Sequence, residues 1–497
     1  MKKKFKSIFF EAIVGIFIFI IAGKLVFQEK LNDLDELWQY NFAKNILFGL
    51  VPYRDFNIIS TPFFSFLAAI FLKIFTNQLI IMRIYNTLIF SGILYMAYRL
   101  FKLLGINRYI SVLATIIMYF LFYYDLGVEY NYLILLITML SLYIELQGLK
   151  KNSMFDYKKN EIILGILIGL TIVTKHTIGI LLTGMFCLYK IIFITNKEDF
   201  NKVLKIILFR VAGAIIPLIL FLGYLIINNS FNDFINYAIL NIGEFKNNVS
   251  YLYLFNNTNI LIMMFSFIVP ISFLSFIYYI RFKNKKQKEL ILLIYAITMF
   301  CGMFPIANSG HFIIYAFLGI TYSIYLMYLF CKNIINDIKL KIFIKEFIKI
   351  VVLLFIIAYS IKSVSNVINI YKELYKNNNI KYFNWIIIDN NLEEQIKNID
   401  EYIMNNSKKV YILDSSAAIY MIPMDIYNKD YDMFNKGNFG KNGEERLLTE
   451  ISKSHNTQYL ILKDGYKRNW QTPIKIIEFV KENLNKVGEI EIFDIYE

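Results

Sequence analysis

Acidic side chains stand in the first polar stretch of the chain, directly after an apolar run. Within residues 32–47, Asp35 and Glu36 fall in the first turn of a predicted helix whose apolar residues share one face. Carboxylates in such a place can act on a substrate. They can also complement the positive end of the helix dipole, a contribution of about 0.3–1 kcal/mol. Helix physics alone favours the second role.

Basic side chains follow in two further stretches. The segment Gly49–Phe56 predicts a fixed turn that presents Arg54 and Asp55 at the membrane surface. Arg54 fits a headgroup contact as well as a functional role. Lys175 and His176 join two apolar runs with almost no loop between them, so Lys175 is either an interfacial anchor or a group directed into a cavity.

Two other short turns carry polar groups. Glu129 fits the lining of a cavity or a solvated loop, and His311 fits an interfacial hydrogen bond more readily than a metal ligand. All these groups are expected on one membrane face, where cations would neutralise a lipid phosphate. Histidine and cysteine are too scattered for a metal cage, so no metal ligands are predicted and the use of a divalent metal is left open.

The composition sets the class of protein. Of 497 residues, 57% are apolar and only 18% are charged, which excludes a soluble enzyme, a disordered chain and a collagen-like fibre. A net charge of +14 fits basic cytoplasmic loops against anionic headgroups, and no nucleic-acid-binding motif is present. We therefore expect an α-helical, polytopic protein of the cell membrane.

Apolar runs predict about eleven transmembrane helices with the N-terminus inside. The run at 58–75 is assigned to an interfacial helix, because counting it as a span would place the later basic loops outside. The first outer loop is then 28–78. The expected spans are 8–27, 79–101, 109–124, 131–147, 161–175, 177–195, 203–227, 259–281, 290–306, 311–331 and 346–363.

The polar tail predicts a small extracytoplasmic α/β domain. The division is 1–363 for the transmembrane domain and 364–497 for the accessory domain, which shows no motif for chemistry of its own. Its expected elements are strands at Lys409–Asp414, Tyr459–Lys463 and Glu489–Tyr496, and helices from Ser415, over Glu444–Ser452 and over Ile474–Leu484.

The order of these motifs resembles the integral-membrane glycosyltransferases of the C-type fold. Within that class it looks like the branch of protein O-mannosyltransferases and aminoarabinose transferases. The matching features are Asp35-Glu36 after the first span, Gly49–Phe56, the interfacial helix with Pro62, Thr174–Thr177, and Gly310-His311 before a late span. The layout of spans and tail also matches.

The resemblance implies a polyprenyl-phosphate-linked sugar donor and a lipid, protein or glycan acceptor outside the membrane. Asp35, with Glu36 beside it, would be the catalytic group, and Asp35 would be the general base for an inverting transfer. Arg54, Lys175 and His176 would bind the donor phosphate. Asp55, Glu129 and His311 would line the cavity.

Other classes of protein remain open at this point. A flippase or other transporter is one, although the sequence shows no half-to-half repeat and its charges gather at one face. A polysaccharide polymerase or ligase is another, and a sensory membrane protein with a ligand-binding tail is a third. The sequence does not identify the sugar, the acceptor or the oligomeric state.

Overall fold

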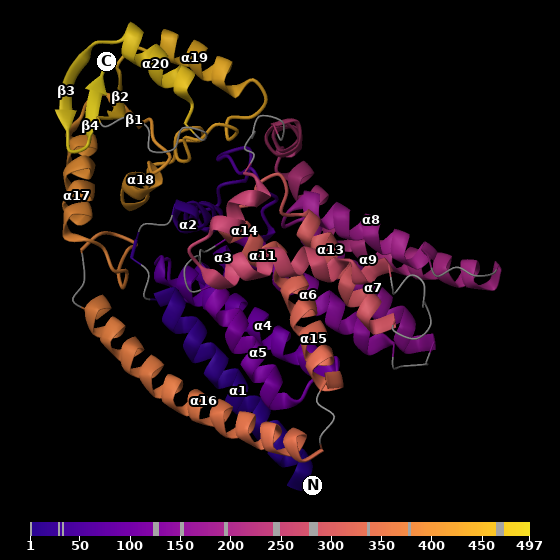
Figure 1. Cartoon of the computed structure of the whole chain (residues 1–497). Helices are drawn as coiled ribbons and strands as arrows, with labels where there is room; N and C mark the ends of the chain where they lie inside the picture. Colours follow the sequence, from indigo (N-terminus) through magenta and orange to yellow (C-terminus); the bar gives the residue numbers. More distant parts are fainter. Residues whose placement is uncertain are drawn as a thin grey trace.

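A helical bundle and a small α/β domain make up the molecule (Figure 1). The computed structural model describes residues 2–27, 30–31, 34–122, 129–149, 154–192, 197–241, 249–277, 287–334, 338–375, 379–463 and 472–497. Several basic positions used to predict the orientation, among them Lys150, Lys151 and Arg281, lie outside these ranges. The helices of the bundle are α1 (Lys2–Phe27), α2 (Leu34–Leu47), α3 (Phe63–Ile74), α4 (Ile80–Leu103), α5 (Arg108–Leu121), α6 (Tyr130–Gly148), α7 (Met154–Ile172), α8 (His176–Ile192), α9 (Lys197–Ile227), α10 (Phe231–Phe234), η2 (Ile235–Ile239), η4 (Tyr251–Asn256), α11 (Ile260–Phe273), α13 (Gln287–Cys301), α14 (Ser309–Tyr315), α15 (Phe317–Ile334) and α16 (Ile338–Tyr375).

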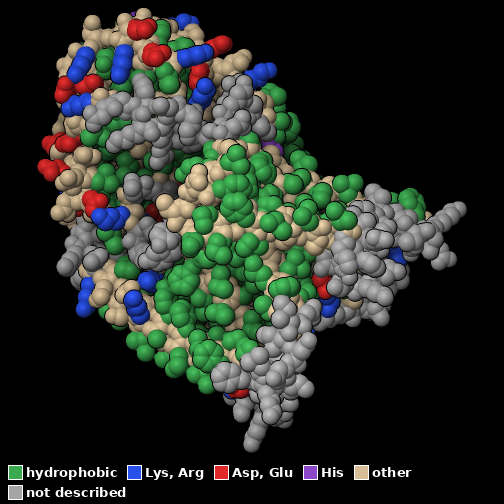
Figure 2. All heavy atoms as spheres, in the orientation of Figure 1, with side chains coloured by type: hydrophobic (Ala, Val, Ile, Leu, Met, Phe, Trp, Pro, Cys, Tyr) green, Lys and Arg blue, Asp and Glu red, His purple; other side chains and the backbone are tan. Residues whose placement is uncertain are grey.

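Long apolar helices show that the chain is a polytopic membrane protein, as predicted. Within the described residues, six helices are long and apolar enough to cross a membrane: α1, α4, α6, α9, α16, and α11 with its extension to Ile277. The pair α14 and α15, bent by 62°, makes a seventh if it forms one span. Hydrophobic side chains cover the middle of the molecule (Figure 2). The total of eleven spans stays a prediction.

Helix α3 occupies the doubtful apolar run after the first polar loop. Its 12 residues extend about 18 Å, well short of the roughly 30 Å of a hydrocarbon core. One side packs inward through Phe64, Ala68 and Leu72, while Ile70 and Ile74 are exposed. These features agree with an interfacial helix.

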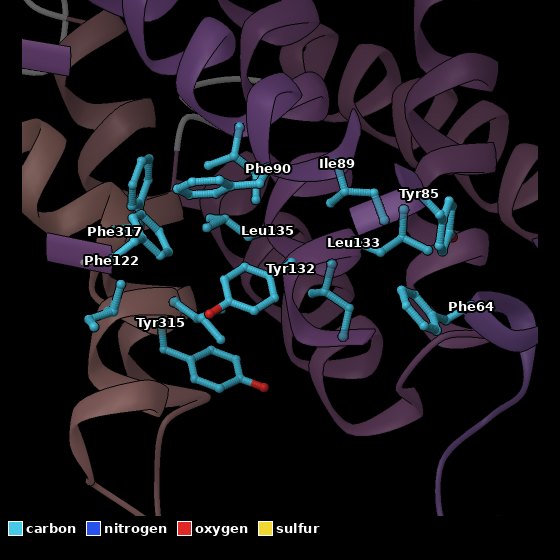
Figure 3. Packing of buried hydrophobic residues seen from close by; sticks show 14 of the residues in the cluster. Phe64, Tyr85, Ile89, Phe90, Phe122, Tyr132, Leu133, Leu135, Tyr315 and Phe317 are labelled. Carbon is cyan, nitrogen blue, oxygen red and sulfur yellow. The ribbon is translucent and has the colours of Figure 1, made fainter. Parts of the chain in front are cut away.

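Aromatic side chains fill the core of the bundle between α4, α5, α6 and α15 (Figure 3). The ring of Phe122 lies 4.7 Å from that of Phe90, 5.7 Å from that of Phe317 and 5.9 Å from that of Tyr132. Tyr315 lies at the edge of this cluster and, unlike the phenylalanines, carries a hydroxyl that needs a partner.

Charged side chains are buried at one crossing of the bundle. Arg210 on α9 pairs with Glu161 on α7 at 2.7 Å and with Glu145 on α6 at 3.5 Å. Lys190 and the hydroxyl of Tyr295 also contact Glu145, at 3.2 and 2.8 Å. Because buried charges require partners, this network fixes how α6, α7, α8, α9 and α13 meet.

The tail forms a four-stranded sheet with helices around it. The strand order is β1-β2-β4-β3, with β1 and β2 parallel and the other neighbours antiparallel. Helix α16 has 38 residues, about 57 Å, and runs through position 364 before the tail begins. The tail elements are α17 (Asn390–Asn405), β1 (Lys409–Ile412), α18 (Ala418–Met424), α19 (Gly443–Lys453), β2 (Thr457–Leu462), α20 (Ile474–Asn483), β3 (Lys486–Ile490) and β4 (Phe493–Tyr496).

Most of the tail elements form where they were predicted, with one correction. The single final strand expected over Glu489–Tyr496 is wrong, because the turn of the β3–β4 hairpin falls within that stretch. Glu491 has a positive φ of 47° and turns the chain between the two strands. Helix α17, which the sequence did not lead us to expect, packs against α18.

Helix α2 forms as predicted, but its burial extends beyond the one apolar face that the sequence predicted. Every residue from Glu36 to Asn45 is buried. The tail covers its polar face: Trp38 donates to the Ser415 carbonyl at 3.1 Å, and Lys44 pairs with Asp425 at 2.7 Å.

Candidate functional site

Two adjacent acids at the start of α2 face different surroundings. The side chain of Asp35 is exposed and lies close enough to Tyr130, the first residue of α6, to interact electrostatically with its hydroxyl. Glu36 points inward and forms a bidentate ion pair with Arg83 of α4. Its two carboxylate oxygens accept from Nε and Nη2 of the guanidinium, at 2.8 and 2.9 Å. Both partners of this pair are almost fully buried. Of the two acids, Asp35 is the one a substrate can reach.

The far end of α2 is fixed by a backbone motif. Gly49 has a φ of +87°, a conformation that side-chain-bearing residues rarely adopt. Its N–H donates to the carbonyl of Ile46, and that of Leu50 donates to Asn45. This pattern ends the helix cleanly and directs the chain into the turn that carries Arg54.

Lys175 lies in the turn between α7 and α8 and is held by side chains from two other helices. Its ammonium donates to the hydroxyl of Tyr315 at 2.8 Å and to Oδ1 of Asn131 at 3.2 Å. The Tyr315 hydroxyl donates in turn to the same Asn131 oxygen at 2.6 Å. The ammonium also lies over the rings of Tyr130 and Tyr315, 5.5 and 5.3 Å from their centres.

The predicted cavity residues Glu129 and His311 lie beside this lysine. Glu129 accepts a hydrogen bond from Nδ2 of Asn131 at 2.6 Å and interacts electrostatically with Lys175. The ring of His311 stacks on Tyr315, with centres 5.9 Å apart, and Asn308 accepts from its backbone N–H at 2.9 Å. We call Glu129, Tyr130, Asn131, Lys175, His311 and Tyr315 the Lys175 cluster.

His176 also lies near Lys175, and the two interact electrostatically. Its ring nitrogens have no hydrogen-bond partner within the described part of the chain. Both nitrogens are themselves buried, so the ring keeps an N–H donor that is not used by the protein.

Arg54 and Asp55 form a separate pair. The guanidinium donates to both carboxylate oxygens of Asp55 at 2.9 Å, and one nitrogen donates to the Asn228 carbonyl at 3.1 Å. The Arg54 hydrogen bonds keep the pKa of Asp55 below its usual value. Lys429 of the tail donates to the carbonyl of Arg54 at 2.9 Å. The segments that contact Arg54 and Asp55 are different from the segments that contact Lys175. The Arg54 side chain is 42% exposed despite these contacts.

Sequence reasoning missed four of the residues that build the site: Arg83, Tyr130, Asn131 and Tyr315. A signal was present for three of them, because Tyr130 and Asn131 directly follow Glu129, and Tyr315 stands one helical turn after His311. Nothing in the sequence pairs Arg83 with Glu36, which lies 47 positions away.

The arrangement combines an exposed carboxylate and an ammonium, each of which lies near Tyr130, and the neighbours of the ammonium are mostly neutral. Such an ammonium can bind a phosphate, and the carboxylate can take a proton from a hydroxyl. Within the described residues, no three histidine, cysteine or acidic side chains are grouped so that they could hold a metal ion. The use of a divalent metal therefore stays open.

Comparisons with known proteins point to one class. Residues 60–227 match the sequence profile of the dolichyl-phosphate-mannose-protein mannosyltransferase family. A similar solved structure is ArnT from Cupriavidus metallidurans bound to undecaprenyl phosphate, with a TM-score of 0.56 and 11% identity over 99% of this chain and 98% of that one. The apo state of the same protein gives a TM-score of 0.55, with the same identity and coverage.

A further similar structure is the Archaeoglobus fulgidus oligosaccharyltransferase in complex with Zn and sulfate. Its TM-score is 0.50 and its identity 14%, over 90% of this chain and 67% of that one. No curated protein sequence matches significantly. The chain is thus a multi-pass membrane protein with the C-type glycosyltransferase fold, and the resemblance drawn from its sequence is confirmed.

Proposed function

We propose that this protein transfers a sugar from a polyprenyl-phosphate-linked donor to a hydroxyl acceptor at the outer face of the membrane, with inversion. The observation that carries the proposal is the exposed carboxylate of Asp35 beside the Lys175 cluster. The ArnT structure similar to this chain holds undecaprenyl phosphate, and the family profile matched by residues 60–227 is named for a lipid-phosphate sugar donor.

In the proposed reaction, Asp35 is the general base. It removes the proton from the acceptor hydroxyl, and the oxygen bonds to the anomeric carbon from the face opposite the phosphate. The bond from that carbon to the phosphate oxygen breaks, and its electron pair leaves with the phosphate. This leaving group is already ionised, so it requires positive charge and no proton.

The remaining site residues take supporting roles in this proposal. Lys175 neutralises the donor phosphate, with His176 beside it, and Arg54 binds the phosphate or its headgroup from the neighbouring loop. Glu129 and His311, beside Lys175, and Asp55, beside Arg54, would line the cavity that holds the donor. Glu36, paired with Arg83, holds α2 so that Asp35 points outward.

The proposed orientation places the site and the tail outside the cytoplasm. The N-terminus and the α/β domain lie at opposite ends of the bundle, and α2 lies next to that domain (Figure 1). An N-terminus on the inner side, as the basic loops predict, therefore puts Asp35 and the tail on the outer side.

The test is mass spectrometry of envelope glycans and lipid-linked sugars in a deletion strain. The deletion should remove one sugar from a glycan, lipid or protein and leave its polyprenyl-phosphate form accumulated. Wild-type protein and Glu445→Gln, a change at an exposed acid of the tail, should restore the sugar. Asp35→Asn should not, at equal protein level.

Two outcomes would overturn the proposal. One is full restoration by Asp35→Asn, which would remove the base. The other is a deletion strain whose glycans and lipid-linked sugars are all unchanged. Loss of a flippase would give a different result from loss of a transferase. The lipid-linked sugar would then stay inaccessible to reagents added outside the cell.

A further inference from the structure

Three cations stand at the end of the bundle opposite the candidate site. Arg99 and Lys102 lie in the last turns of α4, and Arg108 is the first residue of α5. Arg83, which pairs with Glu36, is on the same helix as Arg99, 16 positions earlier and about 24 Å away along the axis. The group therefore lies near the level of the other headgroup layer.

Tyrosine side chains hold Arg99 in place. Its Nη2 donates to the hydroxyl of Tyr143 on α6 at 2.5 Å, and its Nη1 donates to that of Tyr95 at 3.4 Å. The guanidinium also lies over both rings, 5.4 Å from the centre of Tyr143 and 5.8 Å from that of Tyr95. Stacking of this kind fixes the plane of the guanidinium before any ligand binds.

Arg108 is held in a similar way by two rings. Its guanidinium lies 4.7 Å from the ring centre of Phe10 on α1 and 4.8 Å from that of Tyr109. One nitrogen donates to the Tyr109 hydroxyl at 2.9 Å. Tyr98 of α4 connects the two arginines, because its ring lies 6.0 Å from that of Tyr95 and its hydroxyl interacts electrostatically with Arg108. The surface around them is built from α1, α4, α5 and α6.

The charge of this surface is not balanced. Lys102 is paired with Glu11 of α1, but no carboxylate pairs with Arg99 or Arg108 in the described part of the chain. Arg108 is exposed and Arg99 half-buried. Each guanidinium has five N–H donors, so several donors remain for a ligand with negatively charged oxygens.

The surroundings identify the ligand as a lipid. Next to Phe10, the side chains of Ile8 and Phe9 are about three-fifths exposed, and Leu113 of α5 is also exposed. These apolar groups can contact acyl chains while the arginines contact a phosphate. A free phosphate ion has no acyl chains and would make no use of the apolar groups. Basic surfaces between helices on the cytoplasmic side commonly bind anionic headgroups.

We propose that Arg99 and Arg108 bind the headgroup phosphate of an anionic phospholipid at this end of the bundle. The site is separate from Asp35 and Lys175 and does not depend on the proposed glycosyl transfer. The bound lipid would hold this end of the bundle at the inner leaflet, through arginines that the neighbouring rings already position.

The experiment is native mass spectrometry of the full chain in detergent, titrated with phosphatidylglycerol or phosphatidylcholine. Wild-type protein should retain phosphatidylglycerol, and the double variant Arg99→Gln/Arg108→Gln should weaken this binding about tenfold or more. The matched control Lys202→Gln/Lys205→Gln removes two exposed cations of α9 and should leave binding unchanged. Arg99→Lys keeps the charge but loses the planar stacking, and it should bind at an intermediate level.

Three results would overturn the inference. Equal binding by wild type and the double variant would remove the two arginines as ligands. An equal loss in the α9 control would show a general effect of charge. Displacement of the lipid by free glycerol phosphate at similar concentration would indicate a small-anion site. Thermal unfolding of each variant separates a binding defect from a folding defect, and Arg99→Lys keeps the test valid if the double variant unfolds.

Discussion

Two neighbouring acids show how much the surroundings of a residue decide its role. Asp35 and Glu36 are adjacent in the sequence and share one helical turn, so propensity treats them alike. The buried guanidinium of Arg83 takes up Glu36, whereas Asp35 stays at the surface beside Tyr130. The two side chains should therefore respond differently to replacement.

We predict that Glu36→Ala destabilises the protein and Asp35→Ala does not. Removing Glu36 leaves the charge of Arg83 buried without its partner, which typically costs about 3–5 kcal/mol. Asp35 is exposed and should change stability by less than about 0.5 kcal/mol. Thermal unfolding in detergent measures both effects, and equal midpoints for the two variants would refute the structural role of Glu36.

Lys175 should affect activity more than stability. We expect Lys175→Gln to lower kcat/KM for transfer by about 10²-fold or more, because the leaving phosphate loses its counter-charge. Lys175→Arg should restore part of the activity, since it keeps the charge. The readout is transfer from a synthetic polyprenyl-phosphate sugar in detergent, and wild-type rates for Lys175→Gln would contradict the assignment.

A buried acid of the tail should make stability depend on pH. Burial raises the pKa of Asp432 to about 7, although the Asn428 N–H, Asn41 and Lys44 favour its charged form and Asp430 opposes it. The folded protein thus binds this proton more tightly than the unfolded chain, so the stabilisation is lost as pH rises through about 7. We predict that unfolding midpoints measured from pH 6 to pH 8 fall less in Asp432→Asn than in wild type. An identical pH dependence in the two proteins would contradict this.

At the scale of elements, the apolar runs were sufficient to locate the helices of the bundle, because a span must be long and apolar whatever surrounds it. The position of each helix relative to the other elements was harder to predict. The apolar stripe of α2 predicted one buried face, but the polar Asn41 and Lys44 are also buried, by a tail that follows more than 300 residues later. The Lys175 cluster was located in part for the same reason: Lys175, Glu129 and His311 mark span ends, while Tyr315 reads as an ordinary core residue.

The pairing of α7 with α9 depends on glycines that allow close contact. A methyl group on Gly165 would overlap the Arg210 carbonyl, and one on Gly213 would overlap that of Ile162. We predict that Gly165→Ala lowers the unfolding midpoint and weakens the ion pairs of Arg210. The control Gly184→Ala, on α8, adds a methyl group where nothing lies within 4 Å and should be neutral or slightly stabilising. Equal effects of the two changes would exclude this packing argument.

At the scale of the whole molecule, the tail covers α2 and the loop that follows it. Asn57 donates to Asp430 at 2.9 Å and to the Asn438 carbonyl at 2.8 Å, and Asn41 donates to Asp432 at 3.4 Å. Further along, Asn241 donates to the carbonyl of Gly437. The α/β domain is therefore more closely joined to the bundle than a separate accessory unit would be.

We predict that a chain ending after residue 375 loses the protection of α2. Without the tail, the buried polar face of α2 meets water, and its backbone amides should exchange with solvent deuterium much faster than in the full chain. Hydrogen exchange read by mass spectrometry on residues 34–47 measures this, with residues 80–103 of α4 as the internal control. Unchanged protection of α2 would show that the bundle alone holds it.

The first loop and the start of the tail meet beside α2: the N–H of Leu31 donates to the carbonyl of Ile387 at 2.8 Å, and Lys30 pairs with Asp389 at 2.6 Å. During synthesis, the ribosome makes the first of these segments several hundred codons before the second. The opening helices can enter the bilayer while translation continues, but these contacts of the first loop cannot form until the segment around Ile387 has been made. A polypeptide that terminates before Ile387 would thus lack both of these contacts.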